Sequence, residues 1–150
     1  MKKLLVLICM VSLCMVGFSQ TKMKKSEFLI NPHMLESYSQ AQIDQMYAED
    51  FAQLFTLNFY MTNYAVVAGK LPGDNHIEMQ TIDKYAHTGV VTNEEEIIRT
   101  GLVNPNLYDF KQDPYRSTVY PLRTPGYYII IPSKTYYDEV LRANLETFVD

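Results

Sequence analysis

The chain has 150 residues, of which 47% are hydrophobic and 20% are charged, and its formal net charge at pH 7 is −4. This length and composition are those of one ordinary globular domain, and they exclude a disordered, collagen-like or coiled-coil protein. The acidic balance offers no basic face for phosphate groups, so we expect no nucleic-acid partner.

The N-terminal segment has the pattern of a secretory signal. Two lysines precede an apolar run from Leu4 to Phe18, and small residues at positions 17 and 19 fit cleavage after Ser19. The alternative is an uncleaved membrane anchor, but the run is shorter than the roughly 20 residues that span a bilayer. We interpret residues 1–19 as a signal peptide and expect an exported protein, periplasmic or extracellular, with no stable membrane span after cleavage.

Export gives a first testable expectation. Expressed with its own N-terminus in a bacterial host, the exported protein should begin at Gln20, and N-terminal sequencing checks this. An intact Met1 in the membrane fraction would contradict it. Cleavage would also remove Cys9 and Cys14, both of which lie in the apolar run. The exported protein would then have no thiol for a disulfide or a thiolate metal site.

Residues 20–38 are mixed in character and are interpreted as an N-terminal tether, followed by a single α+β domain over residues 39–150. A long central helix is predicted from Gln40 to Ala68. It starts at a capping box formed by Ser39 and Gln42, after which apolar residues recur at three- and four-residue steps. Gly69 suits the left-handed residue that ends a helix.

Three amide side chains lie in the apolar part of this predicted helix. Gln53, Asn58 and Asn63 are spaced so that each lies roughly 140° around the helix from the last. No side of the helix is therefore entirely apolar, which argues against a membrane-spanning helix. We expect a helix packed on most of its faces, with the amides bonding to neighbouring backbone or lying at gaps in the packing.

The second half of the chain is predicted to hold short helices and a small antiparallel strand pair. Residues 77–85 fit a short helix or a strand, with helix preferred. A capping box that starts at Thr92 predicts a helix over residues 93–100, closed by Gly101. The last helix is predicted from Lys134 to Phe148, with Ser133 as its N-cap.

The strand pair is predicted over residues 117–122 and 127–131. Pro125 and Gly126 between them suit the central positions of a type II turn, but two-residue hairpins prefer primed turns, so we expect a looser connection than a minimal hairpin. Pro121 lacks the N–H of a sheet ladder and therefore predicts an edge strand. The run Tyr-Tyr-Ile-Ile-Ile does not alternate, so both faces of the second strand should be covered. The fold class is α+β: a long central helix and a C-terminal helix packed with a strand pair and short helices.

Tyrosine is the most unusual part of the composition, with 12 residues and no tryptophan. Tyrosine and arginine together are typical of interface hot spots. They crowd around the predicted strands, and the candidate binding residues are Tyr115, Arg116, Tyr120, Arg123 and Tyr127. The alternative is that the tyrosines complete a small core. We interpret the protein as a non-enzymatic envelope accessory module that binds another envelope protein or a peptide.

A second group of residues, acidic and histidine side chains, suggests an enzyme as the alternative function. Asp74, His76, Glu78 and His87 are the residues that most resemble metal ligands or an acid/base pair. They lack the spacing of a helical zinc site, and a solvated loop has the same composition. The alternative is a small metal-dependent or His-based hydrolase centred on His76 and His87. Since no cysteine nucleophile, serine elbow or phosphate loop is present, we expect no catalytic residue, cofactor or metal.

Overall fold

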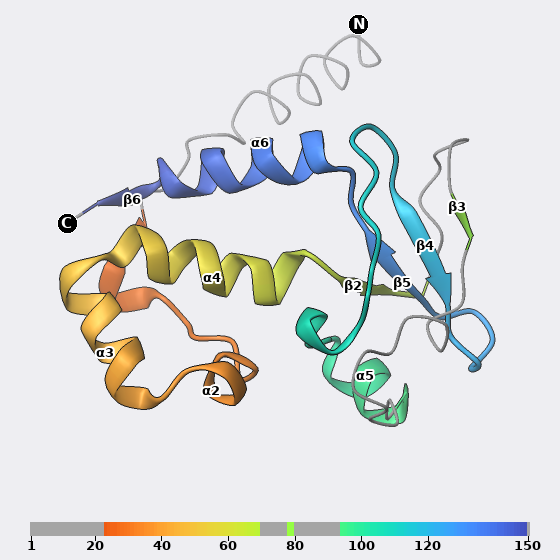
Figure 1. Ribbon diagram of the computed structural model, residues 1–150, viewed down its shortest axis with the longest axis horizontal. Coiled ribbons are helices and arrows are strands. Elements are labelled where there is room, and N and C mark those ends of the chain that lie inside the picture. The colour runs from red at the N-terminus through yellow and green to blue at the C-terminus, as the bar shows by residue number, and fades with distance from the viewer. Residues whose placement is uncertain (1–22, 70–77, 80–93, 150) are drawn as a thin grey trace, which may run out of the picture. The chain divides into compact units, whose positions relative to one another are not determined.

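The structure is a computed structural model that describes residues 23–69, 78–79 and 94–149 (Figure 1). The fold is α+β, as the sequence predicts. In chain order the elements are β1 (Met23–Lys24), η1 (Lys25–Glu27), α2 (Met34–Ser37), α3 (Gln40–Glu49), α4 (Phe51–Asn63), β2 (Val66–Ala68), β3 (Glu78–Met79), α5 (Glu94–Thr100), η3 (Pro105–Leu107), β4 (Thr118–Pro121), β5 (Tyr128–Ile131), α6 (Lys134–Leu145) and β6 (Phe148–Val149).

The chain divides into two compact units. In the smaller one, β1 pairs in parallel with β6, and the ring of Phe28 meets the ring of Phe148 edge-on with centroids 6.0 Å apart. Phe148 was predicted to end the last helix, but α6 stops at Leu145. The β-forming residues that follow, threonine, phenylalanine and valine, favour a strand there. The larger unit, Leu29–Leu145, holds the remaining elements.

The larger unit contains a sheet with the strand order β2-β5-β4-β3. β4 and β5 are antiparallel, as predicted, with Thr118 opposite Ile131. β2 is antiparallel to β5 on its other side, and β3 is parallel to β4. Residues 77–85 were predicted to form a short helix or a strand, with helix preferred. The preference for helix is wrong for Glu78 and Met79, which form β3.

The connection between β4 and β5 spans residues 122–127, longer than a minimal hairpin as expected, and it contains a turn with type II features. The Tyr127 N–H donates to the Thr124 carbonyl at 3.3 Å, which closes the turn around Pro125 and Gly126. Gly126 has a φ of 86°, the left-handed value that the third residue of this turn requires. Glycine adopts this value without steric cost, so the local sequence is sufficient to set this turn.

The prediction that Pro121 marks an edge strand is wrong, because β4 lies between β5 and β3. The N–H of Leu122 donates to the carbonyl of Tyr127, the residue just before β5, at 3.0 Å. Backbone groups of successive residues in a strand point to opposite sides, so the nitrogen of Pro121 faces away from β5. On that side β3 pairs only with Thr118 and Val119. The proline therefore removes no ladder bond from this described sheet.

The predicted central helix is divided into α3 and α4 at Asp50, whose φ of −145° and ψ of 72° are not helical. The capping box of Ser39 and Gln42 is present at the start of α3. The Asp50 carboxylate accepts a hydrogen bond from the Gln53 N–H at 3.0 Å and thereby caps α4. Aspartate is a strong N-cap residue, and this local signal marks the start of a second helix.

The end of the predicted helix is also wrong, because α4 stops at Asn63 and residues 66–68 form β2. Val66 and Val67 are β-branched and fit the surface of a sheet. The antiparallel partner β5 supplies hydrogen bonds that the isolated segment lacks, with Val66 opposite Ile130. Tertiary pairing therefore decides the structure of a segment whose apolar pattern also fits a helix.

The core of the larger unit lies against one face of the sheet. Ile129 and Ile131 of β5 are buried there, together with residues of α5 and of the chain that follows it, including Val103 and Phe110. The alternate residues of β5, Tyr128 and Ile130, are only half-buried. The prediction that both faces of β5 are covered is therefore correct for the face of Ile129 and Ile131 and wrong for the other face, which is partly open.

Part of the predicted tether packs onto α4. The side-chain oxygen of Asn58 accepts from the Asn31 N–H at 2.6 Å, and the Asn58 amide donates to the Leu29 carbonyl at 3.1 Å. Met34 in α2 is fully buried. The expected amide-to-backbone bonding is thus present at Asn58, where it satisfies two backbone groups of a segment that has no regular secondary structure.

Replacing this buried amide has a definite expected cost. Asn58→Ala should lower the free energy of unfolding by about 1–3 kcal/mol, because it removes the partners of two backbone groups near the core. Chemical denaturation of the purified variant measures this. The matched control is Thr56→Ala, at an exposed position of the same helix, which should change stability by about 0.5 kcal/mol or less. Equal effects of the two variants would contradict the role assigned to Asn58.

Candidate functional site

The five predicted tyrosine and arginine binding residues do not lie on one common surface. Tyr120 is 0% exposed, its ring lies 4.9 Å from that of Phe110, and its hydroxyl accepts from the Lys111 N–H at 2.9 Å. A side chain with no accessible surface cannot contact a partner, so Tyr120 is corrected from a binding residue to a core residue. The alternative that tyrosines complete a small core applies to this position.

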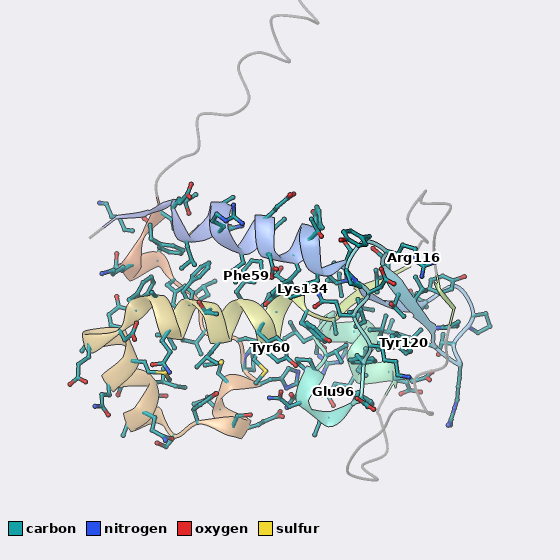
Figure 2. The ribbon with its side chains drawn as sticks, turned by 45° about the horizontal axis from the view of Figure 1, so that its top comes forward. Phe59, Tyr60, Glu96, Arg116, Tyr120 and Lys134 are labelled. Atoms are coloured by element: carbon teal, nitrogen blue, oxygen red, sulfur yellow. The ribbon has the colours of Figure 1, made fainter. Side chains whose placement is uncertain are left out.

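The other four members lie at the two ends of the β4–β5 hairpin. Tyr115 and Arg116 precede β4, while Arg123 and Tyr127 lie at its turn. All four are exposed, and Tyr115 is 83% exposed. The extended chain between residues 116 and 123 rises roughly 3.3 Å per residue, so the two pairs do not form one continuous patch. Figure 2 shows the positions of Arg116 and Tyr120 in the larger unit.

The loop that carries Tyr115 and Arg116 is held by Asp113. The carboxylate of Asp113 accepts from the Tyr115 and Arg116 N–H groups at 2.8 and 2.9 Å, and from the Arg116 guanidinium at 3.2 Å. The Tyr115 N–H foremost, and then the N–H and guanidinium of Arg116, hold the pKa of Asp113 below its ordinary value. The same loop bonds to α6, because the Thr135 N–H and hydroxyl both donate to the Pro114 carbonyl.

At the other end of the hairpin, a carboxylate from α5 holds the turn. Glu94 accepts from the Arg123 N–H at 3.0 Å and from the Thr124 N–H at 3.1 Å. These bonds join the first residue of α5 to a turn 30 residues away in the sequence. Arg123 is bound here through its backbone, which is a structural arrangement that any residue except proline can provide.

The alternative cluster falls mostly beyond the described residues. Asp74, His76 and His87 lie outside them, and of Glu78 the structure describes the backbone in β3. Within residues 23–69, 78–79 and 94–149, no three His, Cys, Asp or Glu side chains gather as metal ligands would. In the same part of the chain, no helix has both the length and the apolar character needed to cross a bilayer.

An apolar groove lies on the partly open face of the sheet, between α4 and α6. Its volume is about 370 Å³. We call it the α4–α6 groove, and the residues that line it are Phe59, Asn63, Val66, Ser117, Ile130, Pro132, Tyr136, Tyr137 and Val140.

Three elements position the walls of the α4–α6 groove. Val66 and Ile130 are cross-strand partners on the same face of the sheet, and form part of its floor. Phe59 of α4 meets Tyr137 of α6 with ring centroids 5.2 Å apart, and Figure 2 shows Phe59 between these two helices. Tyr136 is 61% exposed and Val66 is 42% exposed. The groove therefore offers aromatic and aliphatic surface that solvent still reaches.

None of the described lining residues is a carboxylate, a histidine, a lysine, an arginine or a thiol, and the titratable groups of the lining are tyrosine hydroxyls. Burial raises the pKa of the Tyr137 hydroxyl above its ordinary value, and it raises the pKa of the neighbouring Tyr64 to about 12. Both hydroxyls therefore stay neutral throughout the physiological range. A charged side chain placed in the groove would lose hydration without gaining an opposite charge from the lining, so the groove favours uncharged groups.

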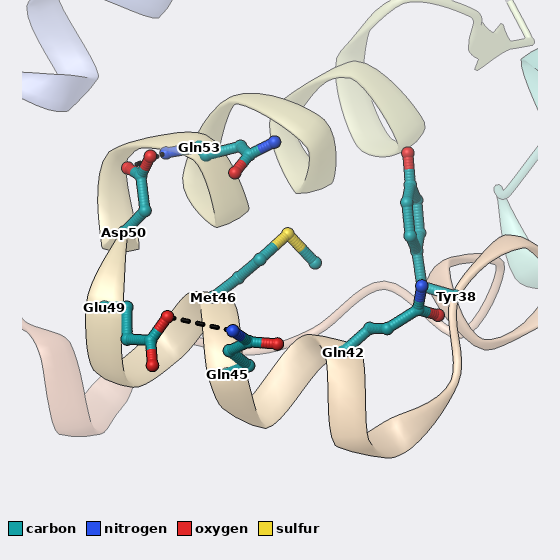
Figure 3. A pocket seen from close by; sticks show the side chains of 7 residues that line it. All are labelled: Tyr38, Gln42, Gln45, Met46, Glu49, Asp50 and Gln53. Atoms are coloured by element: carbon teal, nitrogen blue, oxygen red, sulfur yellow. Dashed lines mark hydrogen bonds between the residues drawn. The ribbon is translucent and has the colours of Figure 1, made fainter.

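A second, more polar pocket of about 320 Å³ lies between α3 and the start of α4 (Figure 3). Several of its polar side chains already bond to one another or to the helix backbone. The Gln45 amide donates to Glu49 at 2.9 Å, and Asp50 caps α4 through the Gln53 N–H. These bonds have a structural role in the two helices, and the α4–α6 groove is the better candidate site.

No protein-family model, curated protein or solved structure matches this chain. The class that can be stated is an α+β fold with an apolar groove over one sheet face. Sequence reasoning missed the groove, although Tyr136 and Tyr137 belong to the tyrosine-rich part of the chain. Val66 could not be assigned to it from the sequence, because its place depends on pairing with Ile130, 64 residues along the chain.

Proposed function

We propose that this protein is an exported, non-enzymatic binding module that holds a segment of another protein in the α4–α6 groove. The observation that carries the proposal is the groove itself, with the side chains of Tyr136 and Val66 exposed at an apolar, uncharged surface. Tyrosine supplies a large contact area with little loss of side-chain entropy, which suits a binding surface.

The chemistry of the lining supports binding over catalysis. An acid/base mechanism needs a titratable group within hydrogen-bond reach of the reacting atoms. Tyrosine hydroxyls are the titratable groups of the described lining, and burial raises the pKa of Tyr137 further from the physiological range. The hydrolase alternative at His76 and His87 rests on the sequence alone, and no described residue adds to it.

Two of the predicted binding residues lie at the rim of the groove in this proposal. Tyr115 and Arg116 come directly before Ser117, which lines the groove, and their loop is bonded to Thr135 next to Tyr136. Apolar centres with polar rims are typical of protein interfaces. We propose that Tyr115 and Arg116 contribute at this rim, as part of the same surface as Tyr136.

Selection from a random-peptide phage library on the immobilised protein tests this function. We expect enriched peptides that carry large apolar residues, and Tyr136→Ala should weaken their binding by about tenfold or more. The matched control is Tyr47→Ala, at an exposed tyrosine of α3 outside the groove lining, which should leave the dissociation constant unchanged. Failure to select any peptide whose binding depends on Tyr136 would overturn the proposal.

A further inference from the structure

We infer that the segment held by the groove is extended and that it joins the sheet as an added strand along the outer edge of β2. This inference rests on the proposed function and specifies how the partner binds. β2 is the end strand in the order β2-β5-β4-β3, and its partner in the described part of the chain is β5. Added strands of this kind are a common form of peptide recognition.

The direction of the backbone groups in β2 follows from the neighbouring hairpin. The Leu122 N–H bonds to the Tyr127 carbonyl, and in an antiparallel pair such hydrogen-bonded positions recur at every second residue. Ile129, two residues after Tyr127, therefore directs its backbone groups toward β4. The next residue, Ile130, directs its N–H and C=O toward β2 instead.

This alternation identifies the residue of β2 that faces outward. Val66 is opposite Ile130, so its backbone groups point inward to β5. Val67 follows Val66 and must direct its N–H and C=O away from β5, to the outer edge of the sheet. An added strand would receive and donate its central hydrogen bonds at Val67.

The same alternation relates the added strand to the groove. A residue paired with Val67 forms backbone bonds, and the next residue along would place its side chain on the face of Val66 and Ile130. That face is the floor of the α4–α6 groove. One extended segment can therefore use both the backbone edge and the apolar cavity.

The chemistry of the edge defines the occupant. Natural proteins protect exposed edge strands by keeping them very short, by placing charged residues, proline or bulges in them, or by covering them. β2 is short, but its three residues are valine, valine and alanine, with no charge and no proline to oppose a short added strand. The groove is lined without charge. The expected occupant is an extended segment with large uncharged apolar residues at alternate positions and no proline opposite Val67.

Amide hydrogen exchange on the intact protein, followed by NMR, tests whether the bound segment pairs with β2 at Val67. In the free protein the Val67 amide should exchange faster than the amide of Val66, which bonds to β5. Addition of a synthetic peptide taken from the phage selection should slow exchange at Val67 by about tenfold or more, because its N–H then gains an acceptor. Unchanged exchange at Val67 in the saturated complex would overturn the inference.

N-methylation of the same synthetic peptide, one residue at a time, tests the pairing from the partner's side. Strand addition predicts alternation, in which methylation of a paired N–H weakens binding by about tenfold and methylation of the next residue has a much smaller effect. Binding that depends on Tyr136 without this alternation would overturn strand addition and leave the proposed function standing. Loss of Tyr136-dependent binding itself would overturn both.

Discussion

Tyr120→Ala is expected to lower the free energy of unfolding by about 3–5 kcal/mol, which is the usual cost of replacing a fully buried aromatic residue. The side chain is 0% exposed, lies 4.9 Å from the Phe110 ring and accepts a hydrogen bond from Lys111. The substitution removes the apolar contacts, leaves a cavity and deletes the hydroxyl. Urea denaturation followed by circular dichroism measures the change.

Two variants separate the sources of this effect. Tyr120→Phe keeps the ring and removes the hydroxyl, so it should cost about 1 kcal/mol. Tyr115→Ala removes a tyrosine that is 83% exposed and should change stability by about 0.5 kcal/mol or less. If Tyr120→Ala were as stable as Tyr115→Ala, the burial of Tyr120 in the core would be contradicted.

Leu54→Ala is expected to lower the free energy of unfolding by about 2–5 kcal/mol. Leu54 lies in the first half of α4 and is 0% exposed. Truncation removes buried methyl groups and leaves a cavity that the helix, packed against α3 and α6, can fill only in part. A domain has about 5–15 kcal/mol of stability in total, so this is a large fraction of it.

Leu35→Ala is the matched control for this prediction, because Leu35 is an exposed leucine of α2. We expect it to change stability by about 0.5 kcal/mol or less. Thermal unfolding followed by circular dichroism measures both variants on the same scale. A similar midpoint for Leu54→Ala and Leu35→Ala would contradict the burial of Leu54 between α4 and its neighbouring helices.

Successive side chains of β5 point alternately to the core and to the groove, so this strand contributes both to stability and to the proposed binding site. Ile129 and Ile131 face the core, whereas Ile130 lies between them and lines the groove. Because successive side chains of a strand point to opposite faces, the same short segment builds the core and the floor of the candidate site. A substitution at Ile130 therefore changes the groove surface, while the buried neighbours Ile129 and Ile131 keep β5 in place.

Much of the local structure could be predicted from the sequence by itself. The capping box at Ser39, the type II turn at Gly126, the β4–β5 strand pair and the start of α6 after Ser133 are all present. Each depends on residues that are close in the sequence, such as a side-chain oxygen and an N–H three residues later. These local caps and turns form largely independently of the tertiary structure.

Tertiary structure decided what local signals could not. Val66 and Val67 fit the end of an apolar helix in the sequence, yet pairing with β5 makes them a strand. Tyr120 is of a residue type common at binding surfaces, yet it packs against Phe110 in the core and is 0% exposed. Strand pairing and burial depend on residues far apart in the chain, so the same residue type can serve a core or a surface. The α4–α6 groove exists because β2, β5, α4 and α6 meet, and the sequence of any one of these elements does not determine it.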